Sequence, residues 1–201
     1  VKDALGNVTT YEYDNMGFPT RTVDALGRVT STVYNSAMQK IADVDALGNR
    51  TTYTYDNAGR PETVKDARGN VSTSVYNARN LIANVDALGN RTSYTFDEVN
   101  RQVAVTSPLG CRSTTVYDLA GQVTASVDPL GNRTSYAYDS AGNQTSVTNP
   151  LGFITTSVYS ANSNRMSASV DPLGNRTSYS YDLAGQQTSR QDARGNRITY
   201  S

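Results

Sequence analysis

The sequence has 201 residues and contains no histidine, no tryptophan and a single cysteine, with 18 basic and 18 acidic residues. Its zero net charge argues against a nucleic-acid or anionic-membrane partner, and the lone Cys111 excludes an internal disulfide. Aliphatic residues are scarce, but 14 tyrosines and abundant threonine and valine indicate an ordered β structure with a thin core.

A glycine marker recurs along the whole chain, at the end of four-residue segments such as Asp3–Gly6 and Asp128–Gly131. Successive marker glycines are 21 residues apart, except for one gap of 20 and one of 22. The turn glycines are Gly6, Gly27, Gly48, Gly69, Gly89, Gly110, Gly131, Gly152, Gly174 and Gly195.

A second marker, an aromatic residue usually followed by aspartate, keeps the same period. Two markers in step indicate about nine tandem units of about 21 residues. We predict structural roles within the repeat for Tyr13, Asp14, Tyr34, Tyr55, Asp56, Tyr76, Phe96, Asp97, Tyr117, Asp118, Tyr138, Asp139, Tyr159, Tyr181 and Asp182.

Within one unit, two short extended runs alternate with two turn signals. In residues 175–182 the side chains alternate, which places Thr177, Tyr179 and Tyr181 on one face of a strand. The segments Asp182–Gly185 and Asp192–Gly195 have the aspartate and glycine that tight turns favour. Each unit is therefore predicted to be a β-hairpin.

The predicted fold is all-β, with the hairpins forming one long, twisted or spiralling antiparallel sheet. The alternative is a parallel β-helix solenoid, but two tight turns in each unit favour hairpins because parallel strands need longer crossovers. The sequence starts and stops within a unit, so we expect residues 1–201 to be a single repeat array from a longer protein.

Three side-chain arrangements follow from this interpretation. Marker tyrosines should stack on equivalent rings of neighbouring units, with their hydroxyls on polar partners. The valines before the turn aspartates, Val23, Val44, Val85, Val127 and Val170, should complete an inner face. The turn leucines should fold back over the sheet edge; they are Leu5, Leu26, Leu47, Leu88, Leu109, Leu130, Leu151 and Leu173.

Units such as residues 48–60 (GNRTTYTYDNAGR) and 174–186 (GNRTSYSYDLAGQ) resemble tyrosine-aspartate (YD) repeats of the rearrangement-hotspot (RHS) family. The resemblance covers the whole chain. It implies large secreted or surface proteins, mostly bacterial, with teneurins among their animal relatives. It also implies hairpins in a spiralling sheet, which in long arrays winds into a hollow shell around a toxin or other cargo.

The candidate ligand sites have simpler explanations. Calcium needs six to eight converging oxygens, whereas each turn has one aspartate, so turn capping is favoured for Asp3, Asp24, Asp45, Asp66, Asp86, Asp128, Asp171 and Asp192. Turn chemistry likewise explains most Asn-x-Ser/Thr sequences, among them Asn49 and Asn90. The recurring Arg50, Arg91, Arg133 and Arg176 could bind an anionic glycan, but solvation or pairing with acids on neighbouring strands is favoured.

The acids are repeated rather than gathered into one constellation, and no histidine is present as a base, so we predict no enzyme activity, metal or cofactor. The predicted function is a structural scaffold, a segment of a secreted or surface shell that encloses or presents cargo such as a toxin. The alternatives are a self-assembling extracellular filament and an adhesive or glycan-binding surface. The expected partners are other repeats of the parent chain, copies of this chain end to end, cargo or a surface glycan, without nucleic acid or a membrane span.

Overall fold

The computed structural model describes residues 1–161 and 163–200; Asn162 and Ser201, which belong to the predicted array, lie outside the described residues. All the regular structure that it describes is β, and nineteen antiparallel strands are assigned to one open sheet. The predicted all-β hairpin fold is therefore confirmed, and the parallel β-helix alternative is wrong. No described segment forms a helix long and apolar enough to span a membrane.

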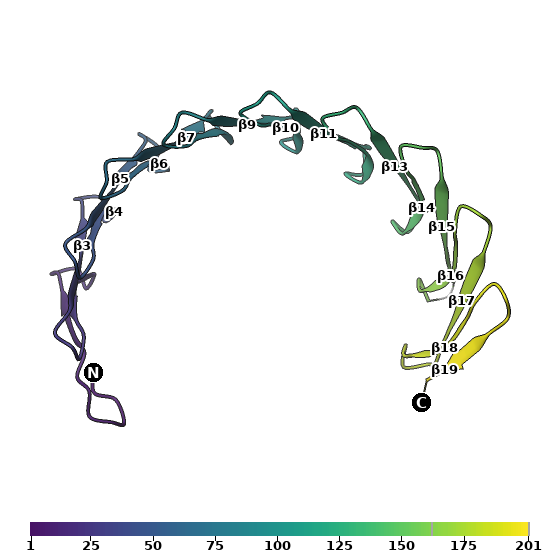
Figure 1. The fold of residues 1–201 in the computed structure, drawn as a ribbon, viewed down its shortest axis with the longest axis horizontal. Coiled ribbons are helices and arrows are strands. Elements are labelled where there is room, and N and C mark those ends of the chain that lie inside the picture. Colours follow the sequence, from purple (N-terminus) through teal and green to yellow (C-terminus); the bar gives the residue numbers. More distant parts are fainter. Residues whose placement is uncertain (162, 201) are drawn as a thin grey trace. The chain divides into compact units, whose positions relative to one another are not determined.

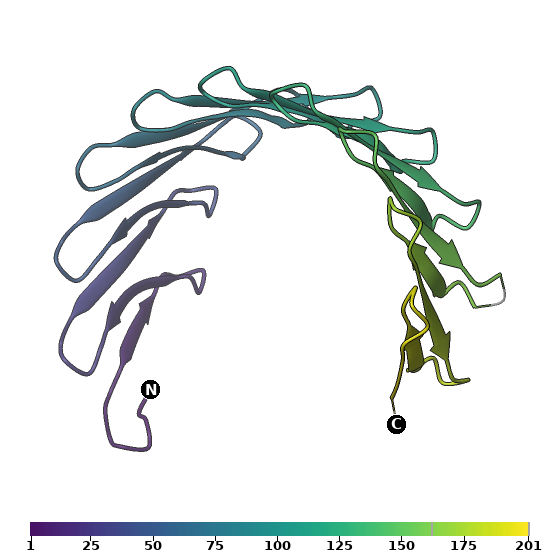
Figure 2. The ribbon, with the colours of Figure 1, turned by 45° about the vertical axis from the view of Figure 1, so that its right-hand side comes forward.

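The chain divides into two compact units, residues 1–94 and 95–201. In each, successive strands lie side by side and are joined by loops at alternate ends (Figure 1 and Figure 2). The first unit contains β1 (Thr10–Tyr13), β2 (Pro19–Val23), β3 (Val29–Tyr34), β4 (Lys40–Val44), β5 (Arg50–Tyr55), β6 (Pro61–Lys65), β7 (Val71–Tyr76) and β8 (Leu81–Val85), and β9 (Arg91–Phe96) includes the boundary.

The second unit continues the same alternation of a six-residue and a five-residue strand. Its strands are β10 (Gln102–Thr106), β11 (Arg112–Tyr117), β12 (Val123–Val127), β13 (Arg133–Tyr138), β14 (Gln144–Thr148), β15 (Ile154–Tyr159), β16 (Met166–Val170), β17 (Arg176–Tyr181), β18 (Gln187–Gln191) and β19 (Arg197–Thr199).

A β-bulge recurs at the same place in the hairpins. In β13 and β14, Ala137 lies opposite Ser146 and Tyr138 opposite Gln144, which leaves Thr145 as the extra residue. Such a bulge increases the local twist of the strands. The equivalent extra residues are Thr20, Ile41, Glu62, Ile82, Thr124, Thr145, Ser167 and Thr188.

Loop length explains the irregular repeat spacing. A standard turn joins residues four apart, as where Asp139 N donates to Asn143 O at 2.9 Å. One loop is a residue shorter, with Asn77 N donating to Asn80 O, and another is a residue longer, with Ser160 N donating to Arg165 O. These two loops account for the gaps of 20 and 22 residues, so every unit keeps the same pair of strands.

The most buried position of the repeat holds a small residue. Ala42, Ala83, Ala125 and Ala168 are 0% exposed, and each directly follows the extra residue of a bulge. Ala125 lies between Val116 on β11 and Ser135 on β13, so strands on both sides cover it. Within the described residues no second layer packs against this sheet. Small side chains are therefore buried by the strands beside them, whereas large ones stay partly exposed.

The predicted packing of the turn leucines is wrong. They project from the tips of tight turns, in which three residues separate the hydrogen-bonded pair, as between Asp45 N and Asn49 O. Such turns are too short to fold a side chain back over the sheet. Their exposed fractions run from 78% at Leu26 to 90% at Leu109. The valines before the turns are half-buried instead.

We predict that Ala125→Leu lowers the free energy of unfolding by about 1–3 kcal/mol, because a fully buried alanine between two strands leaves no room for a larger side chain. Urea unfolding followed by circular dichroism measures the loss. Leu130→Ala, at a position 87% exposed in the following turn, is the control and should change stability by less than about 0.5 kcal/mol. Equal stability of the two variants would contradict this account of the core.

Candidate functional site

The turn aspartates each hold their own turn closed. Asp45 Oδ1 accepts hydrogen bonds from the backbone N–H groups of Leu47 and Asn49, both at 2.9 Å, and Oδ2 accepts one from Asn49 Nδ2 at 2.8 Å. The turn ends with Gly48 at φ 83°, a left-handed conformation that glycine adopts without strain. The carboxylate thus uses three of its roughly four acceptor sites within its own loop.

Hydrogen bonding favours the ionised form of these carboxyls. The hydrogen bond from the Asn49 side chain, followed by that from its backbone, lowers the pKa of Asp45 below the ordinary value. The pKa is also lowered at Asp3, Asp24, Asp56, Asp66, Asp86, Asp97, Asp128, Asp139, Asp171 and Asp192. Among the residues described, no three acidic or cysteine side chains gather in a group that could hold a metal ion.

Each marker aromatic ends the first strand of its hairpin, and the residue after it opens the turn. The Tyr138 hydroxyl donates to the backbone oxygen of Val123 at 2.9 Å, and the Tyr181 hydroxyl donates to Met166 O at 2.9 Å. In both cases the acceptor begins the preceding strand, so the tyrosine ties its hairpin to the one before it. Tyr55 and Tyr117 make the same bond to Lys40 O and Gln102 O.

The marker rings do not stack on one another as predicted. The described ring pair is Phe18 with Tyr34, whose centroids are 5.2 Å apart. Arginines cover three other marker rings instead: the guanidinium carbons of Arg60, Arg101 and Arg165 lie 4.4, 4.6 and 5.8 Å from the ring centroids of Tyr76, Tyr117 and Tyr181. Successive marker tyrosines are separated by two strand widths, roughly 10 Å, which is too far for direct stacking.

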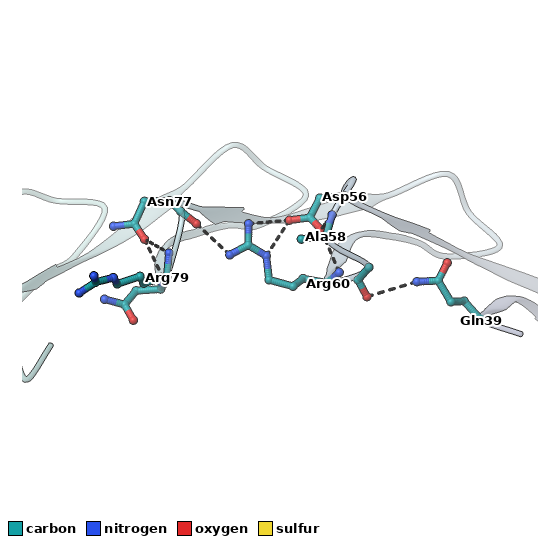
Figure 3. A network of polar contacts seen from close by, with 8 residues as sticks. Gln39, Asp56, Ala58, Arg60, Asn77 and Arg79 are labelled. Atoms are coloured by element: carbon teal, nitrogen blue, oxygen red, sulfur yellow. Dashed lines mark hydrogen bonds and ion pairs between the residues drawn. The ribbon is translucent and has the colours of Figure 1, made fainter. Parts of the chain in front are cut away.

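These arginines connect successive first turns of the hairpins. Arg60 Nε donates to Asp56 Oδ2 at 2.7 Å within its own turn, and Arg60 Nη1 donates to Asn77 O of the next turn at 2.8 Å. Figure 3 shows the Arg60 side chain reaching from Asp56 towards Asn77. Arg101 repeats this arrangement with Asp97 and Asp118 O, at 2.7 and 2.9 Å. The repeat pattern alone did not predict this clamp; the signal for it is an arginine directly after the first-turn glycine or asparagine.

Other residues at this position also face the next hairpin. Gln39 Nε2 donates to Gly59 O at 3.2 Å. Asn143 Nδ2 donates to Asn164 Oδ1 in the next hairpin. At this position glutamine, asparagine and arginine side chains can therefore each join neighbouring repeats.

One polar cluster interrupts the repeat. Asp43 accepts hydrogen bonds from Thr32 Oγ1 at 3.0 Å, Lys40 Nζ at 2.6 Å and the Tyr53 hydroxyl at 2.9 Å. Burial opposes ionisation of Asp43, but these hydrogen bonds outweigh it and lower its pKa, while the bond to Asp43 raises the pKa of Lys40. Asn84 with Tyr94 and Ser126 with Tyr136 occupy equivalent places, so the cluster is a charged version of a cross-strand contact.

The remaining candidates stay apart from one another. Cys111 is exposed. Arg91 and Arg133 are exposed, as the solvated alternative expects, and each donates from Nε to a serine on its own strand, Ser93 and Ser135. The Nδ2 atoms of Asn49 and Asn90 donate to turn aspartates, which supports the turn explanation of these positions.

We predict that stability falls as the pH drops below about 4. The folded pKa of the turn aspartates lies below the unfolded value of roughly 3.9, so their contribution is complete above that value and is lost as the pH falls through the folded pKa. Thermal melting between pH 6 and pH 2 measures it. The combined variant Asp45→Asn, Asp86→Asn, Asp128→Asn is the control, because Asn149 makes the same two Oδ1 bonds without a charge. The control should show a weaker pH dependence, and equal wild-type melting temperatures at pH 2 and 6 would contradict the prediction.

We also predict that Arg101→Lys destabilises the chain by about 1 kcal/mol, because lysine cannot keep the bond to Asp97, the bond to Asp118 O and the contact with the Tyr117 ring together. Chemical unfolding of the variant is compared with that of Arg133→Lys, whose parent side chain donates to Ser135 alone. If the two substitutions have the same effect, the clamp does not stabilise the array.

Comparison with solved structures finds a similar fold in a toxin complex. The structure of a Photorhabdus luminescens Tc holotoxin pore is similar with a TM-score of 0.50 and 17% identity over 93% of this chain. A crystal structure of TcdB2-TccC3-TEV gives a TM-score of 0.49, also at 17% identity over 93% of this chain. The chain spans 12% of the length of each of these solved chains. A search of curated proteins found no match.

The family comparison covers nearly the whole sequence. A family model described as Teneurin YD-shell matches residues 6–200. The repeat resemblance is thereby confirmed, and the chain belongs to the Teneurin YD-shell family.

Proposed function

We propose that residues 1–201 are a single array of YD repeats that forms part of the wall of a secreted or cell-surface shell, which encloses or presents cargo such as a toxin. The observation that carries this proposal is that the repeating polar side chains bond to the repeats themselves. The turn aspartates, marker tyrosines and clamp arginines form hydrogen bonds within a hairpin or to an adjacent hairpin. Family membership supports a structural shell role.

The proposal includes the absence of catalysis. The strongest polar cluster, around Asp43, has its carboxylate, ammonium and phenol groups bonded to each other. The chemistry of that cluster matches a cross-strand link, because its members replace neutral pairs such as Ser126 with Tyr136. Side chains so paired are poorly placed to act on a substrate.

The cargo is proposed by analogy. The similar solved structure is a toxin pore complex, and its 17% identity supports a shared fold alone. We therefore assign the chain to the wall and regard a toxin as one cargo class. Other repeats of the parent chain are the nearest partners. Every described strand between β1 and β19 already pairs with its neighbours in the sheet, and further repeats could pair in the same way.

Electron microscopy of the purified chain, and of a longer natural array that contains it, tests the proposal. The longer array should form hollow particles with a wall one sheet thick, and the isolated chain should remain as discrete strips. Continuous fibres, with copies joined end to end in register, would instead establish the filament alternative. Solid compact particles without an internal space would contradict both.

A further inference from the structure

A basic depression lies between two neighbouring second turns in the unit of residues 1–94. Its volume is about 520 Å³, within the range of small-ligand sites. Arg50 and Thr52 line it from β5, Lys65 from the end of β6, and Asp66 and Arg68 from the following turn.

The strand register puts the charged groups on one face. Thr52 lies opposite Lys65, and Arg50 is two residues before Thr52 on the same strand. Side chains two apart on a strand point to the same face, so Arg50, Thr52 and Lys65 share it. Arg68 extends this surface from the tip of the turn.

The three cationic side chains lack an acidic partner. Among the residues that the structure describes, the guanidinium groups of Arg50 and Arg68 and the ammonium of Lys65 take part in no ion pair. Asp66 accepts hydrogen bonds from the backbone N–H groups of Arg68 and Asn70 and from Asn70 Nδ2. The Asp66 carboxylate is therefore hydrogen-bonded within its own turn. With three cations and this one anion, the lining has a net charge of +2.

Two of the cations depart from the repeat. All other units except the first, which has Lys2, carry an uncharged residue at the position of Lys65, as at Val44 and Thr148, and most carry leucine at that of Arg68, as at Leu47 and Leu88. Those units form the same turn, with the aspartate bonds and positive-φ glycine unchanged. The fold therefore does not require Lys65 or Arg68, which leaves their positive charge to be explained.

A depression beside the corresponding turns of the second unit provides a contrast, although it opens on the other face of the sheet: Thr177, which lines it opposite Ser169, takes the place of Thr51 and not of Thr52. It contains Arg194, which corresponds to Arg68, but its lining also includes Asp171 and Asp192. On the face that matches the first depression, Gln191 stands where Lys65 does. Among the residues that line the depression beside Arg194, acidic charge outweighs basic charge, so an arginine in the turn does not by itself make an anion site.

We propose that the depression lined by Arg50, Lys65 and Arg68 binds the sulfate or carboxylate group of an acidic saccharide. Arginine forks match planar or tetrahedral oxyanions, and the Thr52 hydroxyl can bond a sugar hydroxyl. The largest aliphatic side chain in the lining is Ala67, which suits a saccharide better than the apolar side chains of a peptide. This inference goes beyond the proposed wall function and does not depend on it.

Calorimetric titration of the whole purified chain with a sulfated disaccharide tests the site. The double variant Lys65→Val, Arg68→Leu restores the residues of neighbouring units, so it should fold normally and bind at least tenfold more weakly. Arg133→Ala is the matched control: it removes the same strand position, but the following turn there carries Thr148 and Leu151. Binding by this control should equal that of the wild type. Unchanged binding by the double variant, or no binding by the wild type, would overturn the proposal.

A gain-of-function variant and two further probes sharpen the result. Thr148→Lys with Leu151→Arg should create a second site beside Arg133 and raise the stoichiometry from one to two. Inorganic sulfate should bind more weakly than the disaccharide, and added salt should weaken both because exposed charges are screened. If inorganic sulfate binds as tightly as the disaccharide, the site recognises a small anion only. If polyglutamate of equal charge binds better, the ligand is an acidic protein segment. Either result would overturn the saccharide assignment.

Discussion

The structure depends on pairing between successive hairpins in a sheet that has no second layer in the described residues. A globular domain stabilises its sheet by packing another layer against it, but here the fully buried side chains are alanines held between strands of the same sheet. Stability must come from interactions between nearest neighbours, as in other repeat proteins. This explains why so many side chains bond to an adjacent hairpin, as Tyr138 does to Val123 of the one before and Arg101 does to Asp118 of the one after.

Such a sheet needs bonds that close each turn and bonds that join neighbouring hairpins, and different side-chain contacts supply the two. The turn aspartates satisfy donors inside their own loop, so each hairpin can close without help from another repeat. The clamp arginines and marker tyrosines then act between hairpins. Because the two sets of bonds do not compete, the residue after the first turn can change from Gln39 to Arg60 to Asn143 while a link to the next hairpin is kept.

Sequence patterns predicted the features that depend on local chemistry. Alternating residues and paired turn signals gave the hairpins, and the turn aspartates were expected to cap. The bulge left no signal, since its extra residue is as different as Ile41, Glu62 and Thr188. The leucine prediction failed because it treated an apolar residue in a turn as a core residue, whereas a short loop in a single sheet has no core within reach.

Departures from the repeat are more informative about binding than the repeat itself. A residue present in every unit, such as the turn aspartate, is explained by the need to close every turn. Lys65 and Arg68 occupy places where valine and leucine serve the fold equally well, so their charge has no structural partner to explain it. Asp43 also departs from the repeat, but its neighbours supply a lysine, a tyrosine and a threonine that satisfy it. The two clusters therefore differ in whether the sheet supplies a partner for the charge. Asp43 has such partners, whereas the cations of the basic depression face solvent.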